Sequence, residues 1–182
     1  MKKLKEKMNK NYVPKDFTLS LALFDAIPVI VFGISLIIFS RLFNSALVLI
    51  GALLVFIAGL CKVIWKIIVV LKQKNIWGLF IQMRIMMPIG FVLMIVGIIA
   101  SKDNVDFGRL CSLAFSYPIN LFLIIFVIGM ILMMVFAFSL DGRKLKNNWI
   151  EQITNAIAQI SLLIAALLLK KYMWLLRDDK YD

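Results

Sequence analysis

Charged residues are distributed very unevenly along the chain. Four long stretches contain no Asp, Glu, Lys or Arg: 42–61, 85–101, 110–140 and 152–169. A charge-free apolar run of about 18 or more residues can cross the hydrocarbon core of a membrane as a helix. Such a helix also satisfies its own backbone hydrogen bonds, which lipid cannot do. The pattern therefore predicts four membrane-spanning helices.

A fifth apolar stretch, residues 17–40, precedes these four and is interrupted only by Asp25. It follows a basic segment, as the apolar part of a secretory signal peptide does. Its apolar run is too long for a signal peptide, however, and no small-x-small cleavage site follows it. We interpret it as a retained first membrane helix.

The predicted fold is all-α: a polytopic membrane helix bundle of about five transmembrane helices, with the N-terminus in the cytoplasm. We expect a basic cytoplasmic arm over residues 1–16, the bundle over 17–171 and a charged tail over 172–182. The expected spans are 17–40, 44–66, 79–100, 117–140 and 149–170. Pro118 is expected to separate a short interfacial piece from the fourth span, since proline interrupts helices.

Composition agrees with a membrane location. Hydrophobic residues make up 63% of the 182 residues, whereas soluble globular domains carry just under half. We therefore expect a multi-pass protein of the cell membrane without a soluble catalytic domain.

The basic residues are concentrated on one predicted side of the membrane. The net charge is +11, and 13 of the Lys and Arg residues lie in the segments 1–17, 62–75 and 141–148. Cytoplasmic loops carry an excess of Lys and Arg, which favours a cytoplasmic N-terminus. Anionic lipids of the inner leaflet, rather than nucleic acid, are the expected partners of this charge. The basic tail fits this topology poorly, because it would lie outside.

The cysteine and histidine content limits the chemistry of the chain. Cys61 and Cys111 are isolated, and the chain contains no histidine. Thiol–histidine catalysis, haem ligation by imidazole and most zinc sites need side chains that are missing here. Phosphate-loop, dinucleotide-binding, metalloprotease and nucleophile-elbow motifs are missing too. We therefore assign no catalytic residue, metal site or cofactor, and we disfavour an enzyme.

Polar side chains inside the predicted spans gather toward the cytoplasmic side. At about 1.5 Å per residue, Asp25 lies about 10 Å into the first span. Charged residues inside spans are costly and usually face the bundle interior. The pattern predicts a positively lined inner-leaflet cavity for an anionic ligand or a lipid headgroup. The residues assigned to this candidate site are Asp25, Lys62, Lys66, Gln82, Arg84, Glu151, Asn155 and Gln159.

The last span carries the longest polar pattern. Its polar residues fall within about 100° of helical arc, and Ala166 continues the same face outward. Ordinary hydrogen bonding between helices produces the same pattern, so a structural role is an open alternative. The polar residues of this span are Glu151, Gln152, Asn155 and Gln159, and we call them the polar stripe.

We predict that Asp25 and Arg84 form the charged centre of the site. An acid at that depth has no long stem with which to reach water, so it needs a partner. Pro28 also frees the carbonyl group of Phe24, next to Asp25. Gln82 and Arg84 are two residues apart, or about 200° around a helix, so only one of them can face a narrow cavity.

Simpler roles are open for several of these residues. Lys62 and Lys66 lie one turn apart on one face and suit snorkelling cations that meet anionic lipid. Trp65, between them, suits an aromatic anchor at the membrane interface. Arg84 would lie at the membrane boundary if the third span began late.

Three functions are compatible with this pattern. The leading hypothesis is a small bacterial-type membrane protein that binds or transports a ligand through the inner-leaflet cavity. The second is an accessory or assembly subunit whose polar stripe docks a membrane-protein partner or a second copy. The third is a lipid-modifying enzyme, with Asp25 or Glu151 as acid or base and with Lys66 and Arg84 holding a phosphate.

Overall fold

The computed structural model describes residues 18–102, 105–140 and 145–178. These residues form helices and no strand, which confirms the all-α prediction for the described part of the chain. The predicted arm, 1–16, and the end of the predicted tail, 179–182, lie outside the described residues. The helices are α2 (Leu19–Phe24), α3 (Ala26–Phe43), α4 (Ala46–Lys72), α5 (Trp77–Ala100), α6 (Phe107–Phe115), α7 (Ile119–Ser139) and α8 (Leu145–Asp178).

Five helical segments are long and apolar enough to cross a membrane, as predicted from the charge-free runs. The first combines α2 and α3. The second and the last extend beyond the predicted spans, since α4 continues to Lys72 and α8 begins at Leu145. The segments are Leu19–Phe43, Ala46–Lys72, Trp77–Ala100, Ile119–Phe136 and Leu145–Trp174.

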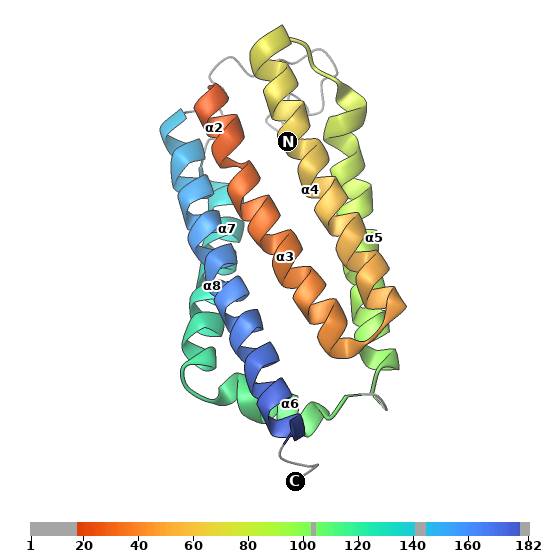
Figure 1. The fold of residues 1–182 in the computed structure, drawn as a ribbon. Helices are drawn as coiled ribbons and strands as arrows, with labels where there is room; N and C mark the ends of the chain where they lie inside the picture. Colours follow the sequence, from red (N-terminus) through yellow and green to blue (C-terminus); the bar gives the residue numbers. More distant parts are fainter. Residues whose placement is uncertain (1–17, 103–104, 141–144, 179–182) are drawn as a thin grey trace.

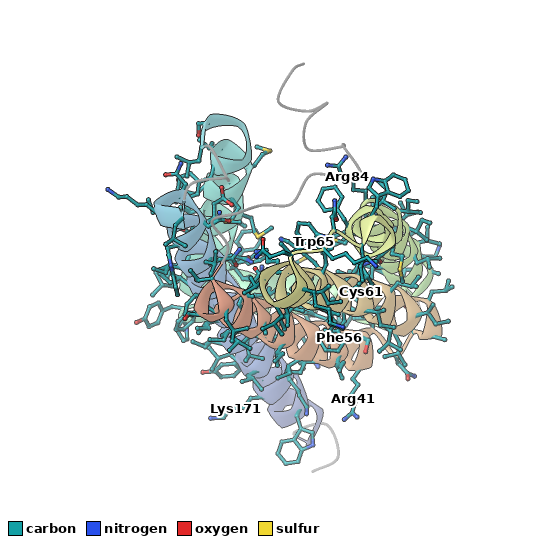
Figure 2. All side chains as sticks on the ribbon, turned by 90° about the horizontal axis from the view of Figure 1, so that it is seen from above. Arg41, Phe56, Cys61, Trp65, Arg84 and Lys171 are labelled. Carbon is teal, nitrogen blue, oxygen red and sulfur yellow. The ribbon has the colours of Figure 1, made fainter. Side chains whose placement is uncertain are left out.

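The long helices form a curved row (Figure 1). Helix α4 packs against α5 on one side and α3 on the other, whereas α8 packs against α3 and α7. The order across the row is therefore α5, α4, α3, α8, α7. Figure 2 looks along the helices and shows α5 and α7 at the two ends. Of the α8 span 50% is buried inside the protein, against 11% of the α7 span, so α8 is the most enclosed of the five spans and α7 the least.

Glycine residues let α4 and α5 approach each other closely. A Cβ atom added at Gly51 of α4 would lie 2.5 Å from the backbone oxygen of Gly90 of α5. A Cβ atom at Gly90 would likewise lie 2.7 Å from the backbone oxygen of Gly51. Small residues at such contacts are a common feature of membrane helix pairs, because they allow the backbones to meet. The two helices therefore form a tight hairpin.

The short helix α6 lies at the end of the molecule where α8 finishes (Figure 1). Asp106 starts α6, and its carboxylate accepts the backbone N–H of Arg109 at 2.9 Å. Pro118 separates α6 from α7, as predicted. Leu110 of α6 packs against Ile119, which is fully buried. The end of the molecule at which α8 finishes is therefore closed by apolar contacts.

Large apolar side chains cover the outside of the row. Every long helix carries apolar side chains with exposed fractions between 45% and 58%. Soluble monomers rarely expose apolar surfaces of such extent. This exterior is compatible with contact with lipid. Examples are Ile30 on α3, Ile57 on α4, Val92 on α5, Ile131 on α7 and Ile157 on α8.

Candidate functional site

Asp25 lies at a break in the first span, between α2 and α3. Thr18 starts α2, and its hydroxyl accepts the backbone N–H of Leu21 at 3.2 Å. Pro28 has no N–H to donate, so the carbonyl group of Phe24 cannot receive its usual helical hydrogen bond. The predicted disturbance of the helix next to Asp25 is therefore confirmed.

Asp25 is paired with Lys66 of α4. The ammonium nitrogen Nζ of Lys66 lies 2.7 Å from Oδ2 of Asp25, and the two side chains are only 5% and 2% exposed. A buried charge without a partner is strongly destabilising, so each of these groups needs the other. The snorkelling alternative is wrong for Lys66, because its ammonium group is held inside the protein.

Three further side chains surround this pair. Lys62 is half-buried one turn before Lys66 and interacts electrostatically with both charged groups. Gln152 of α8 donates a hydrogen bond to Asp25, and Glu151 interacts electrostatically with Lys66. The group joins α3, α4 and α8. We call it the Asp25 cluster: Asp25, Lys62, Lys66, Glu151 and Gln152.

The polar stripe continues from this cluster along α8. Gln159 donates a hydrogen bond to Oδ1 of Asn155 at 3.2 Å. The same amide nitrogen lies 3.6 Å from the sulfur atom of Met130 on α7. Gln159 is 5% exposed, and Ala166 farther along is fully buried. The stripe therefore faces the interior of the row.

The predicted pair of Asp25 and Arg84 is wrong. Arg84 is exposed, and the carbon of its guanidinium group lies 5.1 Å from the centroid of the Phe80 ring. Its helix, α5, lies at one end of the row and packs mainly against α4 (Figure 2), whereas the residues around Asp25 come from α4 and α8. Both residues were expected toward the cytoplasmic side of their spans, but the order of helices around the row keeps them apart.

Gln82 also lies outside the Asp25 cluster. Its amide nitrogen donates to the backbone carbonyl of Ala58 at 3.3 Å and so links α5 to α4. Arg84, two residues later, is exposed. The prediction that these two side chains point to different surroundings is confirmed.

Trp65 packs inside the protein, so the alternative that it is an aromatic anchor at the membrane interface is wrong. Its side chain is 7% exposed, and its indole N–H donates to Oδ1 of Asn75 at 2.9 Å. Its ring lies 5.0 Å from the ring of Phe80. Trp65 therefore fastens the connection between α4 and α5.

The chemistry of this site is inferred from its residues alone. Comparisons with protein-family models, curated proteins and solved structures found no match to this chain. Within the described ranges, no group of three His, Cys, Asp or Glu residues could hold a metal ion. The Asp25 cluster offers two ammonium groups, two carboxylates and an amide. These groups can bind charged or hydrogen-bonding parts of a ligand.

Proposed function

We propose that this chain is a multi-pass protein of the cell membrane that binds or transports a small anionic ligand or an anionic lipid headgroup at the Asp25 cluster. Five apolar helices and an apolar exterior support the membrane location. The basic loops support a cytoplasmic N-terminus. With that orientation, the Asp25 cluster lies in the inner leaflet.

Lys62 is the residue that carries this proposal. Lys66 is already engaged by Asp25 at 2.7 Å. Lys62 is half-buried beside them, and none of the carboxylates in the described ranges forms an ion pair with it. An ammonium group inside a span is costly and indicates a functional partner. A phosphate or carboxylate group of a ligand would supply that partner.

Native mass spectrometry in mild detergent tests the proposal. The wild-type protein is expected to retain a small anionic species or an anionic phospholipid. Lys62→Gln is expected to weaken its binding about tenfold, because a charge-assisted contact is worth about 1.5 kcal/mol or more. Arg84→Gln is the matched control, since it removes one positive charge outside the cluster.

The two variants define the results that would contradict the proposal. Equal retention by Lys62→Gln and Arg84→Gln would contradict a ligand site at the Asp25 cluster. A wild-type protein that carries no bound anion in several mild detergents would contradict it as well.

An accessory or assembly subunit is the second candidate function. Only 18% of the α5 span and 11% of the α7 span are buried inside the protein. The polar stripe was expected to dock such a partner, but it faces the interior of the row and is not available to one. The surfaces left for a partner membrane protein or a second copy are the long apolar faces of these end helices. A stoichiometric partner that remains bound to Lys62→Gln would favour this function over ligand binding.

The geometry disfavours a lipid-modifying enzyme. That function needs Lys66 and Arg84 to hold one phosphate group. Lys66 is buried against Asp25, whereas Arg84 is exposed on α5 and lies over Phe80. The two cations therefore do not meet in the described part of the chain.

A further inference from the structure

Two buried amide oxygens on α8 have unmet hydrogen-bonding capacity. They are Oε1 of Gln152 and Oε1 of Gln159, and neither has a hydrogen-bond partner among the described residues. The two side chains are only 3% and 5% exposed. A buried acceptor without a partner costs about 1–3 kcal/mol. Such groups in proteins usually meet ordered water.

These oxygens belong to a row of amide side chains along one face of α8, which we call the amide line. Gln152 and Gln159 are seven residues apart, which is about 10 Å along the helix and about 20° around it. Gln152 donates to Asp25, and Asn155, between the two glutamines, accepts from Gln159. The line therefore runs from the Asp25 cluster to Gln159, near the middle of the Leu145–Trp174 span.

Flipping the side-chain amide of either glutamine, so that its oxygen and nitrogen exchange places, would not remove the unmet hydrogen-bonding capacity. It would leave an unpaired donor in place of an unpaired acceptor. Water both donates and accepts, so it satisfies either arrangement. The chemistry of the line thus fits water better than it fits a simple cation or anion.

The line ends at Gln159. Ser161 is buried, but its hydroxyl donates to the carbonyl of Ile157 in its own helix at 2.9 Å. Farther along α8 the buried positions are apolar, and they leave no polar group to continue the path: Leu162, Ala165, Ala166 and Leu169.

We infer that the amide line of α8 binds a short chain of ordered water, which forms a hydrated half-track from the Asp25 cluster to the middle of the span. Its members are Gln152, Asn155 and Gln159. This inference goes beyond the proposed ligand, because it needs no anion. It rests only on the proposed membrane location.

Cysteine reactivity in reconstituted membranes tests for this water. In a chain whose native Cys61 and Cys111 are replaced, Gln159→Cys puts a thiol on the track. Ile160→Cys puts one at nearly the same depth on the outer face, where Ile160 is 44% exposed. Methyl methanethiosulfonate is small and uncharged and reacts with the thiolate form, which a dry apolar environment disfavours.

Gln159→Cys is expected to react at least about tenfold faster than Ile160→Cys. Its rate should also rise about tenfold per pH unit while the pH lies below the thiol pKa of about 8.5. Asn155→Cys, at a half-buried position, should react as Gln159→Cys does. This second variant keeps the test valid if Gln159→Cys fails to fold.

Complete labelling of every variant in sodium dodecyl sulfate verifies that each thiol is present. Equally slow reaction at positions 155, 159 and 160 in the membrane would overturn the half-track, because the amides would then be dry interhelical groups. Equally fast reaction at all three would overturn it too, and it would also contradict the membrane location. The two failures are therefore distinguishable.

Discussion

Asp25 interacts with side chains from two other helices. Lys66 of α4 lies 2.7 Å from its carboxylate, and Gln152 of α8 donates a hydrogen bond to it. Pro28 interrupts the helix at this point, so Asp25 also lies where the backbone of the first span changes from α2 to α3. Its carboxylate therefore holds together three helices of the row.

Removing this carboxylate should destabilise the whole protein. Asp25→Asn removes the carboxylate that lies 2.7 Å from the buried ammonium group of Lys66, which is expected to cost about 3–5 kcal/mol. Unfolding of the detergent-solubilised protein measures the change. The double variant Asp25→Leu with Lys66→Met should be more stable than Asp25→Asn, because it buries no charge.

Arg84→Gln provides the comparison for this prediction. Arg84 is exposed, and its substitution should change the free energy of unfolding by less than about 0.5 kcal/mol. A stability of Asp25→Asn equal to that of Arg84→Gln would show that the buried pair contributes nothing.

Much of this site was predicted from the sequence, but the predicted partner of Asp25, Arg84, was wrong. Depth along each span placed Asp25, Lys66 and Arg84 toward the same side of the membrane, and depth can be counted from the sequence. Choosing between Lys66 and Arg84 requires knowing which helices are neighbours, and apolar runs do not encode this. Gln152 was part of the predicted stripe but not of the predicted ligand-binding residues. Its hydrogen bond to Asp25 depends on the same helix order.

At the scale of helices, the apolar runs predicted the spans because each run reaches about the length that a membrane crossing needs. The helix ends were harder to predict. Helix α4 continues past Lys66 to Lys72, and α8 begins at Leu145, before the apolar run. Polar residues can extend a helix beyond an apolar segment, so hydropathy locates the middle of a span better than its ends.

The α4–α5 hairpin yields a second stability prediction. In Gly51→Ala the new methyl group would lie 2.5 Å from the backbone oxygen of Gly90, so the helices must move apart. We expect a loss of about 1–3 kcal/mol in the free energy of unfolding, as for other overpacked sites.

Gly78→Ala is the matched control for the hairpin. A Cβ atom added at Gly78 has nothing within 4 Å, and alanine favours a helix over glycine by up to about 1 kcal/mol. Gly78→Ala should therefore be neutral or stabilising in the same unfolding experiment. Equal behaviour of the two variants would mean that α4 and α5 are not in close contact.

The order of the row is a property of the whole molecule. Helices α5 and α7 are at its ends, and the Asp25 cluster lies where α3 meets α4 and α8. Hydropathy identifies which segments cross a membrane but not which segments touch. Inter-helix contacts of small residues, such as Gly129 against Ala158, help to specify that order. Such contacts can be identified only once the helices are paired.

Five crossings, as proposed, would place the first and the last helix ends on opposite sides of a membrane. Along the direction of the helices, α2 begins at the top of the bundle and α8 finishes at the bottom (Figure 1). With a cytoplasmic N-terminus, the C-terminus is therefore expected outside, even though Lys170 and Lys171 are basic. Alkaline phosphatase fused after Asp182 should be active, and green fluorescent protein fused there should be dark.

Fusions between α7 and α8 should give the reverse result, because α8 begins at the same end of the bundle as α2 (Figure 1). If both sets of fusions report the opposite side, the protein is inverted and the Asp25 cluster lies in the outer leaflet. The proposed anion would then reach Lys62 from outside the cell. If both fusion sites report the cytoplasm, α8 does not cross the membrane. Gln159 could not then lie at the middle of a span, and the hydrated half-track would fail with the topology.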